Sequence, residues 1–143
     1  MNRIIIAILV FTCLSFSAKG QSINDTITNW QLYKGSELLL KNHDFSSIIQ
    51  KVEIKTSDRL EDLIVRVNYC TRNEVNYERH VWFQCDDRNI YSSEDKAKLN
   101  EPFIIRNDSL SEIRQYYSNK PIAVFYKDSS REKGILIGIL EFK

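Results

Sequence analysis

Two segments of the chain alternate apolar and polar residues with a period of two, and this alternation restricts the fold more than any other feature. In LIVRVNY, residues 63–69, every second side chain is apolar or aromatic. In HVWFQC, residues 80–85, the apolar side chains are at positions 81, 83 and 85. Successive side chains of a β-strand point to opposite faces of a sheet, so each segment is expected to be a strand with one face against a core. The second strand then brings three side chains together on its more polar face: His80, Trp82 and Gln84.

Further short strands are expected along the rest of the chain. Residues 30–40 indicate a hairpin around the turn Lys34-Gly35-Ser36, and Ile90-Tyr91 indicates a short return strand after a turn at 86–89. The segment GILIGILEF, residues 134–142, is apolar on both faces, which predicts a central strand that is buried on both sides. The remaining expected strands are 48–55, 102–105 and 122–126.

One helix is expected over Ser109–Ser118. Ser109 and Glu112 have the spacing of a capping box, and Leu110 and Ile113 recur at helical spacing. The chain therefore predicts a mainly β fold: a single antiparallel β-sandwich-like domain of about seven or eight strands, with one helix near 109–118. An open barrel is the alternative.

The N-terminus has the three parts of a signal peptide. Arg3 is followed by an uncharged apolar run over 4–16, and Ala18-Lys19-Gly20 offers small residues at a cleavage site before Gln21. The apolar run is shorter than the ~20 residues that a transmembrane helix needs. Residues 1–20 are therefore expected to be removed on export, leaving 21–143 as one globular domain in the periplasm or outside the cell. No later segment is apolar enough to span a membrane.

Charge excludes some classes of partner. The chain has 20 lysines and arginines against 19 acidic residues, and removal of residues 1–20 leaves 18 against 19, a net charge of −1. A near-neutral domain with interspersed charges has no electrostatic footprint for nucleic acid or for an anionic membrane.

Two cysteines, Cys70 and Cys85, remain after export, and an even number in an oxidising compartment favours a disulfide. Geometry opposes it. If 63–70 and 78–85 are the arms of one hairpin, the cysteines are out of register by about six residues, or ~20 Å, whereas a disulfide needs Cα atoms within ~7 Å. A disulfide requires the two strands to lie in different sheets, or a bulge. We expect Cys85 to be buried and unpaired, with the disulfide as the alternative.

The layout as a whole resembles uncharacterised small secreted β-rich proteins of Gram-negative bacteria. The resemblance rests on the export segment before Gln21, Trp30 in the first strand, polar turns leading to Leu60 and Leu110, and one helix before VFYK at 124–127. It implies a compact β-sandwich with a helical connection, and it carries over no catalytic or binding residue.

Motifs of catalysis and metal binding are weak. The chain has neither G-x-S-x-G nor H-E-x-x-H, and His43 and His80 are its two histidines. Cys70, Cys85 and His80 project to different faces, which disfavours a zinc site. We expect no metal and no cofactor.

The leading hypothesis is an exported, non-enzymatic binding module with a protein or glycan partner. Its candidate surface is the face of Trp82, His80 and Gln84 together with loop residues Arg72, Glu74 and Tyr77. An aromatic side chain there could anchor a partner or stack on a sugar, although cover by a second layer or by the helix is the expected environment of Trp82. The alternatives are a small-ligand carrier with a lipocalin-like barrel and, third, an enzyme.

Overall fold

The computed structural model describes residues 26–70 and 74–143. The predicted signal peptide, residues 1–20, and Arg72 lie outside these residues. In the described part of the chain, nine strands and one helix are present. Their bounds are β1 Ile27–Lys34, β2 Glu37–Asn42, β3 Lys51–Ile54, β4 Leu63–Tyr69, β5 Asn76–Cys85, β6 Arg88–Lys98, β7 Phe103–Ile105, α2 Asn107–Tyr117, β8 Ile122–Asp128 and β9 Ile135–Phe142.

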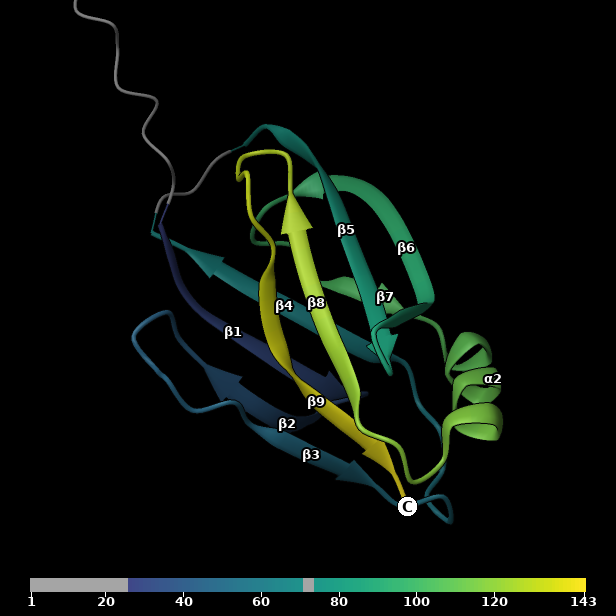
Figure 1. Cartoon of the computed structure of the whole chain (residues 1–143). Helices are drawn as coiled ribbons and strands as arrows, with labels where there is room; N and C mark the ends of the chain where they lie inside the picture. Colours follow the sequence, from purple (N-terminus) through teal and green to yellow (C-terminus); the bar gives the residue numbers. More distant parts are fainter. Residues whose placement is uncertain (1–25, 71–73) are drawn as a thin grey trace, which may run out of the picture.

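The strands form two layers, as Figure 1 shows. One sheet has four strands in the order β2-β1-β4-β7, and the other has five in the order β3-β9-β8-β5-β6. Every neighbouring pair is antiparallel except β3 and β9, which are parallel. The predicted β-sandwich-like fold is therefore confirmed, and the described strands close into no barrel.

Alternation sets which side chains fill the space between the sheets. The strand β4 has the burial pattern expected from its sequence, with positions 63, 65, 67 and 69 buried. The strands β5 and β8 alternate in the same way, so Val81, Phe83 and Val124 have no exposed surface. Trp30 also joins the layers, since its indole Nε1 donates to the carbonyl oxygen of Ile137 at 3.0 Å. The core thus fills the space between the two inner faces and is mainly apolar.

The hairpin considered above for the cysteines, with residues 63–70 and 78–85 as its arms, is not formed. The strand β4 pairs with β1 and β7 in the four-stranded sheet, and β5 pairs with β6 and β8 in the five-stranded sheet. The two strands are consecutive among the strands but lie in different layers. Alternation specifies which face of a strand is buried but not which strand pairs with it, so the sequence pattern suited either arrangement.

Two strands differ in length from their predictions. The return strand predicted at Ile90-Tyr91 is the 11-residue β6, whereas the strand predicted at 48–55 is the four-residue β3. The strand β6 lies at the edge of its sheet and carries many charged side chains, which is typical of edge strands. Because its sequence shows no apolar alternation, the full length of this strand was not predicted.

The predicted central position of β9 is confirmed, because it lies between β3 and β8. Burial on both sides is wrong: Leu140 and Phe142 are buried, and Leu136, Ile139 and Glu141 are half-buried on the opposite face. Nothing in the described part of the chain forms a third layer over this outer face (Figure 1).

The helix α2 is present, with Leu110 and Ile113 buried, but the capping box is not formed. The N-cap residue is Arg106, and its side chain makes no capping hydrogen bond. Instead, Asp62 in the loop before β4 accepts a hydrogen bond from the backbone N–H of Asn107 through Oδ1 at 2.8 Å. The end of the helix agrees with the sequence, since Asn119 follows it with φ +60°.

Candidate functional site

Aromatic side chains gather on the outer face of the five-stranded sheet. Trp82 on β5 lies opposite Phe125 on β8 in the strand register. Their rings are nearly parallel, with centroids 5.1 Å apart and planes 8° apart. His80, two residues before Trp82, stacks on the indole at 4.8 Å and 27°. We name the three residues His80, Trp82 and Phe125 the aromatic stack.

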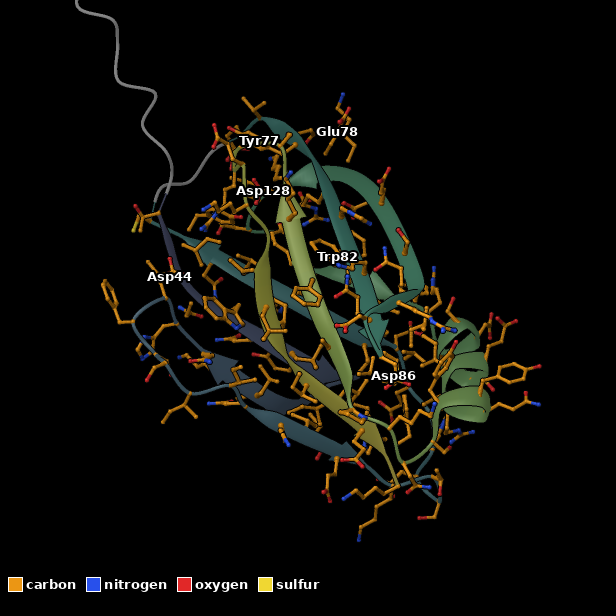
Figure 2. The ribbon with its side chains drawn as sticks, in the orientation of Figure 1. Asp44, Tyr77, Glu78, Trp82, Asp86 and Asp128 are labelled. Carbon is orange, nitrogen blue, oxygen red and sulfur yellow. The ribbon has the colours of Figure 1, made fainter. Side chains whose placement is uncertain are left out.

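The aromatic stack is half-buried, and its cover differs from the prediction. The edge of the indole lies against Gly134 in the β8–β9 connection, where a Cβ atom would come within 2.7 Å of Cη2 of Trp82. Figure 2 shows Trp82 on the near side of the five-stranded sheet, away from α2. Cover of Trp82 by a second layer or by the helix is therefore wrong. The glycine of this connection covers one edge of the indole, and Trp82 as a whole is half-buried.

The indole N–H has no partner among the described residues. Trp82 Nε1 is not among their buried unpaired atoms, and no acceptor within the described ranges takes a hydrogen bond from it. An N–H that faces solvent beside apolar rings is available to a ligand at little desolvation cost. The neighbouring polar groups differ, because His80 Nε2 lies 2.7 Å from Ser92 Oγ and Gln84 Nε2 donates to Asn89 Oδ1 at 2.9 Å.

An open depression adjoins the stack at His80. Its outer-face lining includes Glu78, Glu94, Lys96 and Lys127, and Figure 2 shows Glu78 at the same end of the sheet as Asp128. Glu78 and Lys96 are partners in the β5–β6 register. None of the four charged side chains forms an ion pair with another residue in 26–70 or 74–143. The stack is thus bordered by two acidic and two basic groups that the protein does not use internally.

The structure brings together only some of the predicted site residues. His80, Trp82 and Gln84 share the outer face, as the alternation predicted. Tyr77 does not, because it packs partly buried against the hydrophobic core. Glu74 lies at the Cys70 end of the molecule and pairs with Lys98, and Arg72 lies outside the described residues.

Sequence reasoning missed Phe125, Lys127 and Glu94. In β8 the outward positions 123, 125 and 127 alternate with the buried Val124 and Tyr126, so the direction of Phe125 could have been read from the sequence. Its position beside Trp82 depends on the pairing of β8 with β5, which are separated by three other elements in the chain. No local signal reports that pairing.

Both cysteines of the described residues are free: Cys70 is exposed and Cys85 is buried. The two strands do lie in different sheets, which was the condition for a disulfide, yet the bond is still out of reach. Cys70 lies beside Glu74 and Lys98, at the end of β5 where Asn76 pairs with Lys98, and Cys85 is at the other end of β5. The separation along the strand is about 30 Å at 3.3 Å per residue, far beyond disulfide reach.

Burial, the largest cause, raises the pKa of the Cys85 thiol above its ordinary value, and the neighbouring Asp86 raises it further. A thiol in this state is a poor nucleophile at neutral pH. Cys85 is therefore a packing residue of the core.

A buried polar cluster joins the two sheets. The hydroxyl of Tyr69 on β4 donates to Asp128 Oδ2 on β8, and Asp128 Oδ1 accepts a hydrogen bond from the Ser130 N–H at 2.9 Å. Burial raises the pKa values of Tyr69 and Tyr126 above their ordinary range, and the charge of Asp128 raises both further. Several hydrogen-bond donors thus hold the carboxylate of Asp128 between the two sheets. We interpret the role of this cluster as structural.

No grouping typical of metal binding is present in the described residues. No three histidine, cysteine, aspartate or glutamate side chains among them are placed to share a metal ion. Likewise, no helix within 26–70 or 74–143 has the length and apolar character needed to cross a bilayer.

No protein-family model matches the chain, and no curated protein matches it.

Proposed function

We propose that the protein is an exported, non-enzymatic binding module that recognises a protein partner through the outer face of the five-stranded sheet. The observation that carries the proposal is the aromatic stack, half-buried on a face that no third layer formed by residues 26–70 or 74–143 covers. Aromatic residues at the centre of a patch with charged groups at its rim have the anatomy of a protein–protein interface.

The geometry favours a protein over a glycan. A sugar stacks on a free ring face, whereas the rings of Trp82, His80 and Phe125 lie face to face, at 5.1 and 4.8 Å, and partly cover one another. The indole N–H and the uncommitted charges of Glu94 and Lys127 suit the backbone carbonyls and the charged side chains of a polypeptide. A glycan remains an outcome of the test below.

Export is part of the proposal and rests on the N-terminal sequence. The signal-like residues 1–20 support secretion to the periplasm or beyond. Mass measurement of the protein recovered from its producing cells is expected to give a chain that begins near Gln21. A chain that retains Met1 and stays in the cytoplasm would contradict it.

The small-ligand carrier receives less support. A carrier encloses its ligand in an apolar cavity, whereas the depressions at His80, at Cys70 and at Gly35 are open and lined mainly by polar and charged side chains.

Affinity capture tests the proposed surface. The protein is immobilised and exposed to periplasmic or culture extract, and any captured partner is then titrated against Trp82→Ser and Lys127→Glu. Loss of a central aromatic is expected to weaken binding about thirtyfold, equivalent to about 2 kcal/mol. Lys127→Glu reverses a rim charge without removing core packing, so its effect does not depend on folding.

The matched control is Tyr33→Ser, on the outer face of the four-stranded sheet. Tyr33 is half-buried beside Arg66, with the guanidinium carbon 5.8 Å from the ring centroid, and it lies on the opposite layer. Its variant is expected to bind as the wild type does. Equal binding by all three variants would rule out the outer face of the five-stranded sheet. Binding that resists protease treatment of the extract and is released by free oligosaccharide would identify a glycan instead.

A further inference from the structure

The connection between β2 and β3 exposes more large apolar side chains than any other described loop. Phe45 is 93% exposed, Ile48 is 71% exposed and Ile49 is 58% exposed, all within residues 43–50. Single exposed apolar side chains are common on protein surfaces, but three in one eight-residue loop form an apolar patch of the kind that marks an interaction site.

The conformation of the loop is held by its own hydrogen bonds. Asn42, only 7% exposed, donates from Nδ2 to the carbonyl oxygen of Ile48 at 2.9 Å and accepts from the His43 N–H at 2.9 Å. The Ser46 N–H donates to the His43 carbonyl oxygen at 3.0 Å, and Ser46 Oγ accepts from the Ile48 N–H at 3.2 Å. The apolar side chains are thus presented by a loop whose conformation is held by these four hydrogen bonds.

The shape of the patch distinguishes between partners. In Figure 1 the β2–β3 connection extends from the side of the sandwich opposite α2, and Asp44 marks it in Figure 2. A stable protein interface buries about 800 Å² on each partner, usually over a broad surface. Three apolar side chains on one protruding loop fit instead the shallow insertion of side chains into the boundary between lipid headgroups and acyl chains.

Charges on the two stems of the loop agree with a lipid partner. Lys41 near the end of β2 and Lys51 at the start of β3 are both exposed, and neither forms an ion pair with another described residue. Asp44 and His43 are the other ionisable groups of residues 41–51. Basic groups on both sides of an apolar tip complement lipid phosphates. The near-neutral charge of the whole chain means that apolar insertion, not long-range attraction, would dominate binding.

We propose that residues 43–50 form a membrane-contact loop, in which Phe45, Ile48 and Ile49 insert into a bilayer surface and Lys41 and Lys51 face the lipid phosphates. This site is independent of the aromatic stack, because it lies on the β2–β3 connection and uses no residue of β5 or β8.

Vesicle sedimentation tests the proposal. The protein is used in the form in which it is recovered from its producing cells. Vesicles of phosphatidylcholine with phosphatidylglycerol, and of phosphatidylcholine alone, are compared for the wild type, Phe45→Ser, Ile48→Ser and Tyr116→Ser. Tyr116 is the matched control, since it is 71% exposed on α2, on the other side of the molecule. Phe45→Ser and Ile48→Ser are each expected to lower partitioning about tenfold, and Tyr116→Ser to leave it unchanged.

Two further measurements make the result specific to the loop. The Phe45→Trp variant is expected to gain a blue-shifted emission that brominated lipid quenches, relative to the wild-type background from Trp30 and Trp82. The Lys41→Gln/Lys51→Gln variant is expected to lose any preference for phosphatidylglycerol but to keep binding. Equal partitioning of Phe45→Ser and wild type, or unquenched emission from position 45, would overturn the proposal. Phe45→Ser should leave partner capture by the aromatic stack intact, so the two proposals can fail separately.

Discussion

Arg79 is a charged residue in the interior, 2% exposed, whose five N–H donors are all used. Its guanidinium makes a two-point contact with Asp95 at 2.8 and 2.5 Å and donates to the carbonyl oxygens of Lys98, Glu101 and Pro102. These bonds tie β5 to β6 and to the connection that leads into β7. At the residue scale, Arg79 is therefore expected to support the strand that carries Trp82.

The Arg79→Met variant is expected to lower the free energy of unfolding by about 3 kcal/mol, because it leaves a carboxylate and several carbonyl groups without their donor. Urea unfolding followed by circular dichroism measures the change. The control is Arg66→Met, since Arg66 is exposed and contacts the ring of Tyr33, a contact worth about 0.5–1 kcal/mol. Equal losses in the two variants would show that the guanidinium of Arg79 is not desolvated in solution.

The two cysteines are expected to differ in reactivity within one molecule. Cys70 is exposed, whereas Cys85 is 3% exposed and its pKa is raised by burial, so little Cys85 thiolate forms at neutral pH. Titration with a chromogenic disulfide reagent, without reductant, should modify one thiol rapidly in the native protein and a second only after denaturation. No reactive thiol in the denatured, unreduced protein would show that a disulfide forms after all.

At the scale of elements, the sequence prediction and the structure differ in how the start of α2 is stabilised. The capping box predicts that Ser109 stabilises the helix, whereas the structure gives this role to Asp62, which accepts the Asn107 N–H. Asp62→Ala is expected to lower the free energy of unfolding by about 1 kcal/mol, and Ser109→Ala by no more than about 0.5 kcal/mol. Thermal or urea unfolding of both variants decides between them, and the reverse order of losses would restore the capping box.

Local pattern predicted the elements better than it predicted their neighbours. The faces of β4 and β5 follow from alternation alone, and the first hairpin follows from its Gly35 turn, where φ is +55°. The length of β6 was missed because an edge strand needs no apolar face. The turn before it was predicted at 86–89, and the structure has it at Asp86 and Asp87, which both have positive φ.

Only part of the candidate site could be predicted, because the sequence pattern does not report which strands pair. His80, Trp82 and Gln84 share a face because they share one strand, but Phe125 and Lys127 reach them through the pairing of β5 with β8. Tyr77 was misplaced because residues before His80 were expected in a loop, whereas β5 begins at Asn76 and directs Tyr77 toward the core.

At the scale of the whole molecule, the last strand completes the second layer. The strand β9 lies between β3 and β8, and Ile137, Leu140 and Phe142 are buried in the core. A chain that ends at Gly134 leaves β3 without the strand it pairs with, leaves β8 with an unpaired edge, and exposes the core face of the other sheet.

We therefore expect truncation before Ile135 to abolish soluble, cooperative folding, as measured by soluble yield and thermal unfolding. The control is full-length Ile139→Ser, which alters a half-buried residue on the outer face of β9 and should still melt cooperatively. A soluble truncated chain with a sharp melting transition would contradict the essential position of β9.

Site-specific photo-crosslinking in the producing cells shows whether the outer face of the five-stranded sheet, which we propose as the binding surface, contacts a partner. A photoreactive phenylalanine analogue replaces Phe125, within the aromatic stack, or Tyr33, on the opposite layer. We expect an adduct of one defined mass from position 125 and none from position 33. An adduct only from position 33, or none from position 125 while the protein is exported and folded, would contradict it.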